Sequence, residues 1–232
     1  MLSILIPTYN ERKNIGDLLE EVEEVLRNEK ITGEIIVIDD NSPDKTWEIV
    51  ENKMKVYNNI RLIKREKKLG LGSAYKRGFK ESEGEMIIEM DADFSHDPKD
   101  IPRFVDKILE CDVVVGSRYV KSGERNDPFF RKIFPLIGNF FYNFFLDFPV
   151  RDATSGYRAY KKTFLKKINL KKIPDDFSFQ AAILFELSRK DAKITEIPIK
   201  FERRKSEKSK YSTRDLFSNL KLFVTLFFHR FI

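Results

Sequence analysis

Several residue types that would narrow the function are scarce in this chain of 232 residues. There is one cysteine, Cys111, so no disulfide can form within the chain, and a reducing compartment is expected. Cys111 lies in an apolar run and is interpreted as a small buried hydrophobe rather than a nucleophile. No window reaches the roughly 18 apolar residues that a membrane-spanning helix needs, and the N-terminal segment lacks the basic and apolar regions of a signal peptide. The sequence therefore predicts a protein that stays in the cytosol or lies on a membrane surface.

The composition is that of a folded protein with a basic balance. Hydrophobic residues make up 41% of the chain and charged residues 34%, which is enough for one substantial core under a polar surface. The formal net charge of +6 favours a partner that carries negative charge, such as a phosphate, a nucleic acid or an anionic membrane.

Short apolar runs alternate with helical patterns in the first half of the chain. Strands are predicted at residues 2–6, 34–38, 60–64, 86–90 and 112–116, and helices at 11–27, 43–57, 73–82 and 98–110. This order predicts an α/β fold with a mostly parallel sheet and helices on both faces. The second half predicts a turn-rich segment at 152–160 leading into a strand, a helix at 178–188, a strand at 193–202, a basic loop at 203–210 and an amphipathic helix at 213–232.

Two pairs of carboxylates follow predicted strands. Asp91 and Asp93 leave the fourth strand one residue apart, and carboxylate oxygens in this arrangement suit Mg²⁺ or Mn²⁺ shared with substrate phosphates. The alternative is an acidic loop that caps the next helix, since Asp97 precedes Pro98. Asp39 and Asp40 end the second strand and are expected to contact a base or a ribose, with a simple turn as the alternative.

Two other features have plainer interpretations. Gly70 and Gly72 suggest a dinucleotide loop, but Tyr75 stands where a third glycine is needed, so a tight turn into a helix is predicted. His96 is interpreted as a hydrogen-bonding loop residue, with metal ligand or general base as the alternative.

Aromatic residues crowd two helical stretches, at 129–148 and 213–232. Core packing is the ordinary explanation of such stripes, and membrane contact beside a basic loop is the alternative. Nucleic acid is not expected as a partner, because these aromatics are patterned as helices rather than as a stacking platform.

Four segments together resemble the dolichol-phosphate mannosyltransferases, which are inverting family 2 glycosyltransferases with a GT-A fold. The segments are Pro-Thr-Tyr-Asn-Glu at 7–11, Asp-Asp-Asn-Ser-Pro-Asp at 39–44, Lys-Leu-Gly-Leu-Gly-Ser-Ala-Tyr at 68–75 and Asp-Ala-Asp-Phe-Ser-His-Asp-Pro at 91–98. The likeness continues through 116–119, 151–158, 179–180 and 201–210. It departs from the family at Glu207, where glycine is usual, and at Ala181 and Ala182, where an acidic residue often follows.

The resemblance implies a role for individual residues. It implies that the nucleoside is held by Pro7, Tyr9, Glu11, Ile38 and Asp40. It implies that the diphosphate lies at Asp91, Ala92 and Asp93, with Mg²⁺ or Mn²⁺ on Asp91, Asp93 and Ser95. Donor or acceptor phosphates would face Arg118, Arg204 and Lys210, and the residues expected to act in catalysis are Asp93, Arg118 and Arg204.

The expected activity is inverting transfer of a hexose, foremost mannose from GDP-mannose, to a polyprenyl or dolichyl phosphate. An ionised acceptor phosphate needs no strong base, which agrees with the absence of an evident base beside the Asp pair. Alternatives are a UDP-glucose or other donor, a soluble sugar acceptor, a nucleotidyltransferase and a catalytically silent membrane-binding module. We expect one domain over 1–232, with a donor half (1–119), an acceptor half (120–211) and a terminal amphipathic helix (212–232). We also expect peripheral attachment to the cytoplasmic face of the membrane, with a small membrane-anchoring protein as a further partner.

Overall fold

A seven-stranded sheet forms the centre of the molecule in the computed structural model, which describes residues 1–125, 138–139, 142–144, 148–201 and 213–230. The strand order is β3-β2-β1-β4-β7-β5-β8. The strands are β1 (Leu2–Thr8), β2 (Gly33–Asp39), β3 (Ile60–Lys64), β4 (Met86–Glu89), β5 (Val113–Ser117), β7 (Arg158–Lys161) and β8 (Ile194–Pro198). Only β7 pairs antiparallel with its neighbours within this sheet, so the predicted mostly parallel α/β sheet is confirmed.

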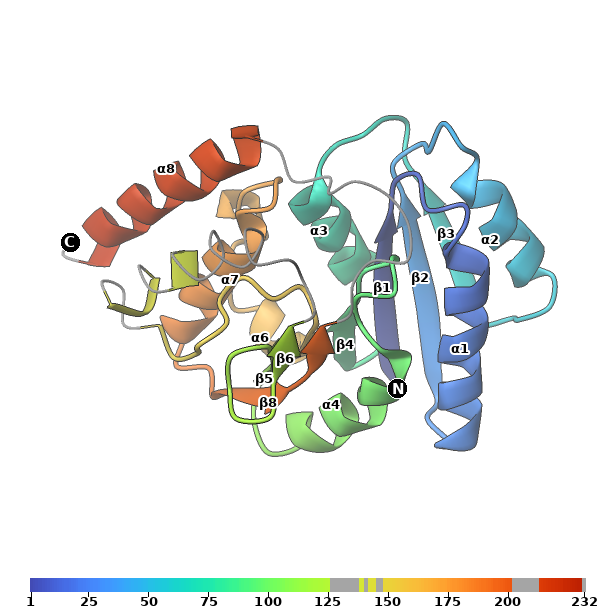
Figure 1. The fold of residues 1–232 in the computed structure, drawn as a ribbon, viewed down its shortest axis with the longest axis horizontal. Coiled ribbons are helices and arrows are strands. Elements are labelled where there is room, and N and C mark those ends of the chain that lie inside the picture. Colours follow the sequence, from blue (N-terminus) through green and yellow to red (C-terminus); the bar gives the residue numbers. More distant parts are fainter. Residues whose placement is uncertain (126–137, 140–141, 145–147, 202–212, 231–232) are drawn as a thin grey trace.

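Helices cover both faces of the sheet, as Figure 1 shows. They are α1 (Ile15–Asn28), α2 (Thr46–Met54), α3 (Leu71–Glu81), α4 (Ile101–Ile108), α6 (Lys162–Leu165), α7 (Phe179–Ser188) and α8 (Thr213–Arg230). A short second sheet joins β6 (Glu124–Arg125) to β9 (Lys200–Phe201), and single 3₁₀ turns occupy Pro98–Asp100 and Leu170–Lys172.

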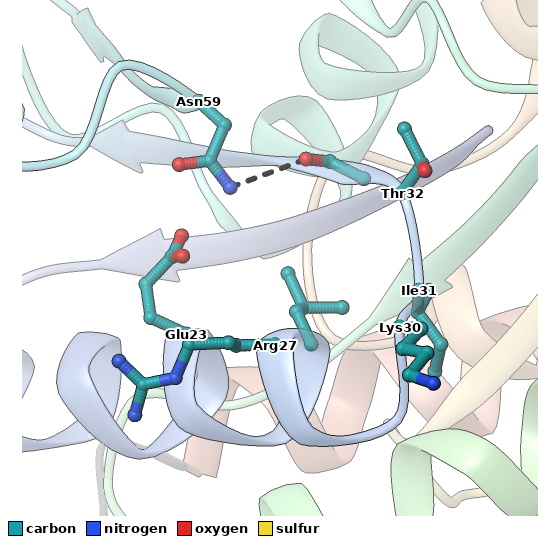
Figure 2. A pocket seen from close by; sticks show the side chains of 8 residues that line it. Glu23, Arg27, Lys30, Ile31, Thr32 and Asn59 are labelled. Atoms are coloured by element: carbon teal, nitrogen blue, oxygen red, sulfur yellow. Dashed lines mark hydrogen bonds between the residues drawn. The ribbon is translucent and has the colours of Figure 1, made fainter.

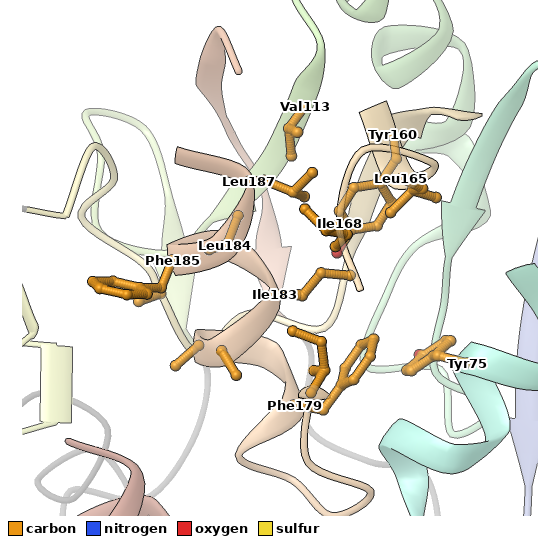
Figure 3. Close-up of a cluster of buried hydrophobic side chains, with 14 of the residues drawn as sticks. Tyr75, Val113, Tyr160, Leu165, Ile168, Phe179, Ile183, Leu184, Phe185 and Leu187 are labelled. Atoms are coloured by element: carbon orange, nitrogen blue, oxygen red, sulfur yellow. The ribbon is translucent and has the colours of Figure 1, made fainter. Parts of the chain in front are cut away.

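Alternation along the strands divides the apolar side chains between two cores. In β1, Ile4 and Ile6 join the core beneath α1, α2 and α4, whereas Leu5 joins the core beneath α3 and α7. Helix α7 lies almost wholly inside the second core, where its side chains meet Tyr75, Val113 and Tyr160 (Figure 3). Because both faces are buried, the strands are continuously apolar, as parallel strands usually are.

The first strand is longer than its pattern predicts. Pro7 was expected to end it, but β1 continues through Pro7 and Thr8 in register with Ile38 and Asp39 of β2. The neighbour on the other side, β4, has its last pair at Leu5 and Glu89, so no ladder bond is required from the Pro7 nitrogen on that side.

Gly70 and Gly72 form the predicted turn into a helix. Gly70 has a φ of 97° and precedes α3, and a Cβ there would lie 2.4 Å from the carbonyl oxygen of Asp175. A Cβ on Gly72 would lie 2.5 Å from the carbonyl oxygen of Pro174. The two glycines therefore allow α3 to approach the segment before α7.

Candidate functional site

The carboxyl ends of β1, β2 and β4 lie at one edge of the sheet, because these strands run parallel. The strand arrows of β1 and β2 point to this edge in Figure 1. Asp40 donates its backbone N–H to the carbonyl of Thr8 at 3.0 Å, and Met90 donates to Leu5 at 3.0 Å. Both carboxylate pairs therefore follow strands that end at the same edge, as the sequence predicts.

Two loops at this edge are joined by hydrogen bonds. The backbone N–H of Asn10, in the loop after β1, donates to the Ser42 hydroxyl at 3.0 Å, and that of Glu11 donates to the Thr46 hydroxyl at 2.9 Å. Both hydroxyls belong to the segment between β2 and the first turn of α2. The two loops thus form one surface that carries the partly exposed Tyr9 and Glu11.

The residues expected to hold a nucleoside are not equally placed to do so. Pro7, Tyr9 and Glu11 are all partly exposed at this edge. Ile38 is fully buried and its side chain packs in the core beneath α3, so only its main chain could face a nucleoside. The nucleoside contacts of all these residues stay predictions.

The acidic pair after β2 is engaged inside the protein. Asp39 accepts hydrogen bonds from the hydroxyls of Thr8 at 2.8 Å and Ser42 at 2.6 Å. Asp40 pairs with Arg65, which follows β3, and accepts from the backbone N–H of Leu69 at 3.1 Å. Burial raises the pKa of Asp40, against the opposing effect of Arg65.

Arg65 lies at this edge and was not singled out by the sequence analysis. Its guanidinium also donates to the Ser73 hydroxyl at 2.8 Å and to the carbonyl of Gly70 at 3.1 Å. It therefore ties the carboxylate after β2 to the start of α3. The available signal was an arginine directly after one strand and an aspartate directly after its neighbour.

The loop after β4 presents the Asp-Ala-Asp segment around a tight turn. Phe94 has a φ of 62°, and this turn brings the Ser95 backbone N–H and hydroxyl to Oδ1 of Asp93, at 3.1 and 2.5 Å. Asp93 is 5% exposed, whereas the side chain of Asp91 is 28% exposed. Ala92 is buried. Ser95 thus fixes the orientation of the Asp93 carboxylate, and its direct contact with a metal stays a prediction.

His96 supports this loop, as the plainer interpretation of it predicted. Its Nδ1 accepts a hydrogen bond from the backbone N–H of Asp91 at 3.0 Å. Its ring is 1% exposed and stacks on Tyr157 with the ring centroids 4.7 Å apart. Because Nδ1 is an acceptor within the protein and the ring is buried, His96 orients the loop.

The donor set at this loop suits a hard divalent cation that is shared with a ligand. Within the described ranges, no group of three or more His, Cys, Asp or Glu residues is placed to hold a metal ion. Asp91 and Asp93 supply carboxylate oxygens from one loop, which is the small protein contribution that Mg²⁺ or Mn²⁺ needs when phosphates complete its coordination. The residues present therefore fit a cation bound together with a diphosphate.

Arg118 lies just beyond β5 and is held by a buried carboxylate. Its Nε and Nη2 each donate to Asp152 at 2.7 Å, its backbone N–H donates to the same group at 3.1 Å, and Nη2 reaches the Thr154 hydroxyl at 2.9 Å. Asp152 is fully buried and Arg118 is 8% exposed. Burial favours a higher pKa for Asp152, but the charge and hydrogen bonds of Arg118 outweigh it and lower the pKa.

This pairing changes the interpretation of Arg118. The sequence analysis expected its guanidinium to face phosphates, whereas the structure commits two of its nitrogens to Asp152, a residue for which no separate role was expected. The phosphate contact stays a prediction. Arg204 and Lys210, the other residues expected at the phosphates, lie outside the described residues.

A buried acid precedes the Asp-Ala-Asp segment. Glu89 ends β4, is fully buried, and accepts hydrogen bonds from the Tyr160 hydroxyl and the Gln180 amide, both at 3.2 Å. Burial raises the pKa of Glu89 to about 8, although Arg158 and the two hydrogen bonds oppose the shift. The sequence signal was a charged residue inside a run predicted to be a buried strand.

A hollow of about 370 Å³ lies at the other edge of the sheet, where β2 begins (Figure 2). It is lined by Glu23, Leu26, Arg27, Lys30, Ile31, Thr32, Gly33 and Asn59. Ligands of open α/β sheets bind at the carboxyl ends of the strands. The hollow therefore lies at the opposite end of the strands from Asp91 and Asp93 and is not part of the candidate site.

The sheet and the helices around it have the GT-A fold. Glucosyl-3-phosphoglycerate synthase from Mycobacterium tuberculosis, solved with Mn²⁺, UDP and phosphoglyceric acid, superposes with a TM-score of 0.74 and 15% identity, over 99% of this chain and 78% of that one. Mannosyl-3-phosphoglycerate synthase from Rubrobacter xylanophilus superposes with a TM-score of 0.73 and 16% identity, over 99% of this chain and 73% of that one. At this identity the likeness establishes the fold.

The chain belongs to glycosyl transferase family 2, whose model matches residues 3–169. It is 35% identical over 226 residues to a dolichol-phosphate mannosyltransferase from Pyrococcus furiosus, covering 95% of this chain and 62% of that protein. It is 34% identical over 213 residues to an undecaprenyl-phosphate mannosyltransferase from Micrococcus luteus, covering 90% of this chain and 86% of that protein. It is 33% identical over 216 residues to a polyprenol monophosphomannose synthase from Mycolicibacterium smegmatis, covering 90% and 80%. The resemblance noted in the sequence is therefore confirmed.

Proposed function

We propose that this chain transfers mannose from a nucleotide-diphosphate donor, foremost GDP-mannose, to a polyprenyl phosphate with inversion at the anomeric carbon. The observation that carries the proposal is the loop holding Asp91 and Asp93 at the edge where β1, β2 and β4 end. The names of the three relatives support mannose and a polyprenyl phosphate. The first of these relatives is longer, since the match covers 62% of it, so the activity is proposed rather than transferred.

Different residues at this edge are proposed to bind the metal and the nucleoside. Asp91 and Asp93 would hold Mg²⁺ or Mn²⁺, which offsets the negative charge that develops on the departing diphosphate. Ser95 keeps the Asp93 carboxylate in one orientation, and the buried His96 holds the loop by accepting a hydrogen bond from the Asp91 backbone N–H. Tyr9 and Glu11 are partly exposed at the same edge and are the accessible candidates for the nucleoside.

The acceptor requires little proton chemistry from the protein. A polyprenyl phosphate is ionised at neutral pH and can attack the anomeric carbon directly, so its binding and orientation are the main tasks. Arg118 lies just beyond β5 and its guanidinium is held in a fixed orientation by Asp152, which supports it as a residue of the acceptor side. Arg204 and Lys210 remain proposed as further phosphate contacts.

A membrane surface is proposed as the place of reaction. None of the helices in the described part of the chain is long and apolar enough to cross a bilayer. In α8, Leu222 and Leu226 are buried toward α7, while Leu220, Val224 and Phe228 are 59%, 45% and 61% exposed. These three residues are spaced four apart and form one outward apolar stripe, which suits an interfacial helix. The cytoplasmic face and a small anchoring protein remain parts of this proposal.

Transfer assays test the proposal directly. The protein is incubated with Mn²⁺ and a polyprenyl phosphate in detergent, and GDP-mannose is compared with UDP-glucose as the donor. We expect mannosyl lipid and GDP from the first donor, and loss of turnover in Asp93→Ala. Preferred use of UDP-glucose would contradict GDP-mannose as the donor. Release of pyrophosphate would indicate a nucleotidyltransferase. Near-normal turnover in Asp93→Ala would contradict the proposed metal site.

A further inference from the structure

A buried polar cluster lies directly behind the Asp91–Asp93 loop, and the proposed reaction assigns it no role. Its members come from four elements: Tyr75 of α3, Glu89 of β4, Arg158 and Tyr160 of β7, and Gln180 of α7. Gln180 is 5% exposed and the other four are fully buried. Figure 3 shows Tyr75 and Tyr160 beside the α7 side chains in this core.

Arg158 joins the cluster to the acceptor side of the site. It lies opposite Glu89 in the antiparallel pair of β4 and β7. Its Nη1 donates to the carbonyl of Gln180 at 2.5 Å and its Nη2 to the carbonyl of Ala153 at 2.8 Å. Ala153 directly follows Asp152, the partner of Arg118. One guanidinium therefore fixes both the first turn of α7 and the turn that carries Asp152.

Glu89 joins the same cluster to the donor side. It ends the strand that leads into Asp91, and its Oε2 accepts from the Tyr160 hydroxyl and the Gln180 amide. The turn at 151–156 also lies against the Asp91 side chain, because a Cβ on Gly156 would be 3.6 Å from both carboxylate oxygens. The cluster thus connects the two sides of the site through the core.

Packing alone gives no reason for so many polar groups in this place. Glu89 Oε1, Arg158 Nε, Gln180 Oε1 and the Tyr75 hydroxyl have no hydrogen-bond partner among the residues that the structure describes. Burying unpaired polar atoms and an ionic group is unfavourable compared with hydrocarbon of the same volume. Of the bonds that are made, the one from Arg158 Nη2 to the Ala153 carbonyl reaches the turn that carries Asp152, and the others join members of the cluster to one another.

We propose that Glu89 and Arg158 are positioning residues. They hold the 151–156 turn, which carries Asp152, the partner of Arg118, in place against the Asp91–Asp93 loop. This inference rests on the proposed function, since it assigns the two sides to acceptor and donor. Neither residue touches substrate, so their loss should lower kcat by misplacing reacting groups while nucleotide binding persists.

Steady-state kinetics of matched variants test the proposal. Glu89→Leu and Arg158→Met remove the connections, whereas Glu89→Gln keeps one carbonyl oxygen, which can accept from both Tyr160 and Gln180 as Oε2 of Glu89 does. The control is Glu34→Leu, which removes a buried glutamate that accepts from Ser3 at 2.6 Å and Arg61 at 2.7 Å at the opposite edge of the sheet. We expect kcat to fall by about tenfold to a hundredfold in the first two variants, and the KM for the donor to change by about twofold or less. Glu89→Gln should restore most of the turnover.

The proposal is overturned if Glu89→Leu and Glu34→Leu lose kcat equally, or if Glu89→Gln is as impaired as Glu89→Leu. Amide hydrogen exchange supplies a readout that needs no activity. Exchange in the 151–156 turn should accelerate in Glu89→Leu, and in Arg158→Met where it folds, but not in Glu34→Leu. Unchanged protection there would also overturn the proposal. If the wild-type protein transfers no sugar, the proposed function fails, and the exchange data still decide whether Glu89 and Arg158 hold this turn.

Discussion

The Arg118–Asp152 pair gives a quantitative test of how the proposed acceptor side of the site is built. Asp152 is fully buried and accepts four hydrogen bonds at 3.2 Å or less, three from Arg118 and one from the Thr154 hydroxyl. Asp152→Asn removes the charge but keeps the shape, and leaves a guanidinium that is 8% exposed without its counter-ion. Breaking a buried pair in this way costs about 3–5 kcal/mol. For a chain of this size that corresponds to a fall of about 6–20 °C in Tm.

Denaturant and thermal unfolding of three variants, each compared with the wild type, provide the assay. Asp152→Asn should lose the full ~3–5 kcal/mol of stability given above, to within about 1 kcal/mol. Arg118→Met combined with Asp152→Leu should recover much of this stability, because no charge is then left unpaired. The control is Glu110→Gln, which breaks an exposed contact with Lys107 and should give no measurable change. A loss below about 1 kcal/mol in Asp152→Asn would refute the buried pair, because such a value is typical of exposed pairs.

The same pair predicts the response to acid. Arg118 holds the pKa of Asp152 below its usual range, so the folded protein binds this proton less readily than the unfolded chain. The stabilisation is therefore present above the unfolded pKa of about 3.9 and is lost as pH falls through the lower folded pKa. Unfolding midpoints measured between neutral and strongly acidic pH should show this decline in the wild type and a smaller one in the double variant. Equal slopes in both proteins would contradict the assignment.

The remaining predictions concern the turn before α3 and the outward stripe of α8. Gly70→Ala should destabilise the fold by about 1–3 kcal/mol in urea unfolding, because φ is 97° and the new Cβ would meet the Asp175 carbonyl; an unchanged midpoint would contradict the close approach. Val224→Asp and Phe228→Ser should weaken sedimentation with anionic vesicles while α8 stays packed through Leu222 and Leu226; unchanged vesicle binding would exclude the stripe as a membrane contact.

Local sequence patterns predicted most of the sheet because strand and helix periods are local properties. Residues 60–64 were predicted as a strand and form β3 without change, and the alternating order correctly gave the parallel sheet. The antiparallel insertion of β7 between β4 and β5 was not predicted. Its four residues, Arg158–Lys161, have no period that distinguishes their direction, and their partners lie far away in sequence.

The sequence predicted that the candidate residues share one edge of the sheet, but not the contacts that they make there. The acidic residues after β2 and β4 do lie at one edge, since parallel strands bring their carboxyl ends together. The partners of those residues were missed, namely Arg65 for Asp40 and Asp152 for Arg118. These pairs join segments 25 and 34 residues apart, and which charge meets which depends on tertiary packing.

Metal-dependent binding of a nucleoside diphosphate tests the central claim most directly. Thermal unfolding is followed with GDP alone, with Mn²⁺ alone and with both, for the wild type and for Asp91→Asn combined with Asp93→Asn. Only the wild type with both ligands should be substantially stabilised. Its free energy of unfolding should rise by about 2.7 kcal/mol when the ligand is at a hundredfold excess over Kd. An equal gain in the double variant, or no gain in the wild type with any nucleoside diphosphate, would contradict a cation and diphosphate site at this loop.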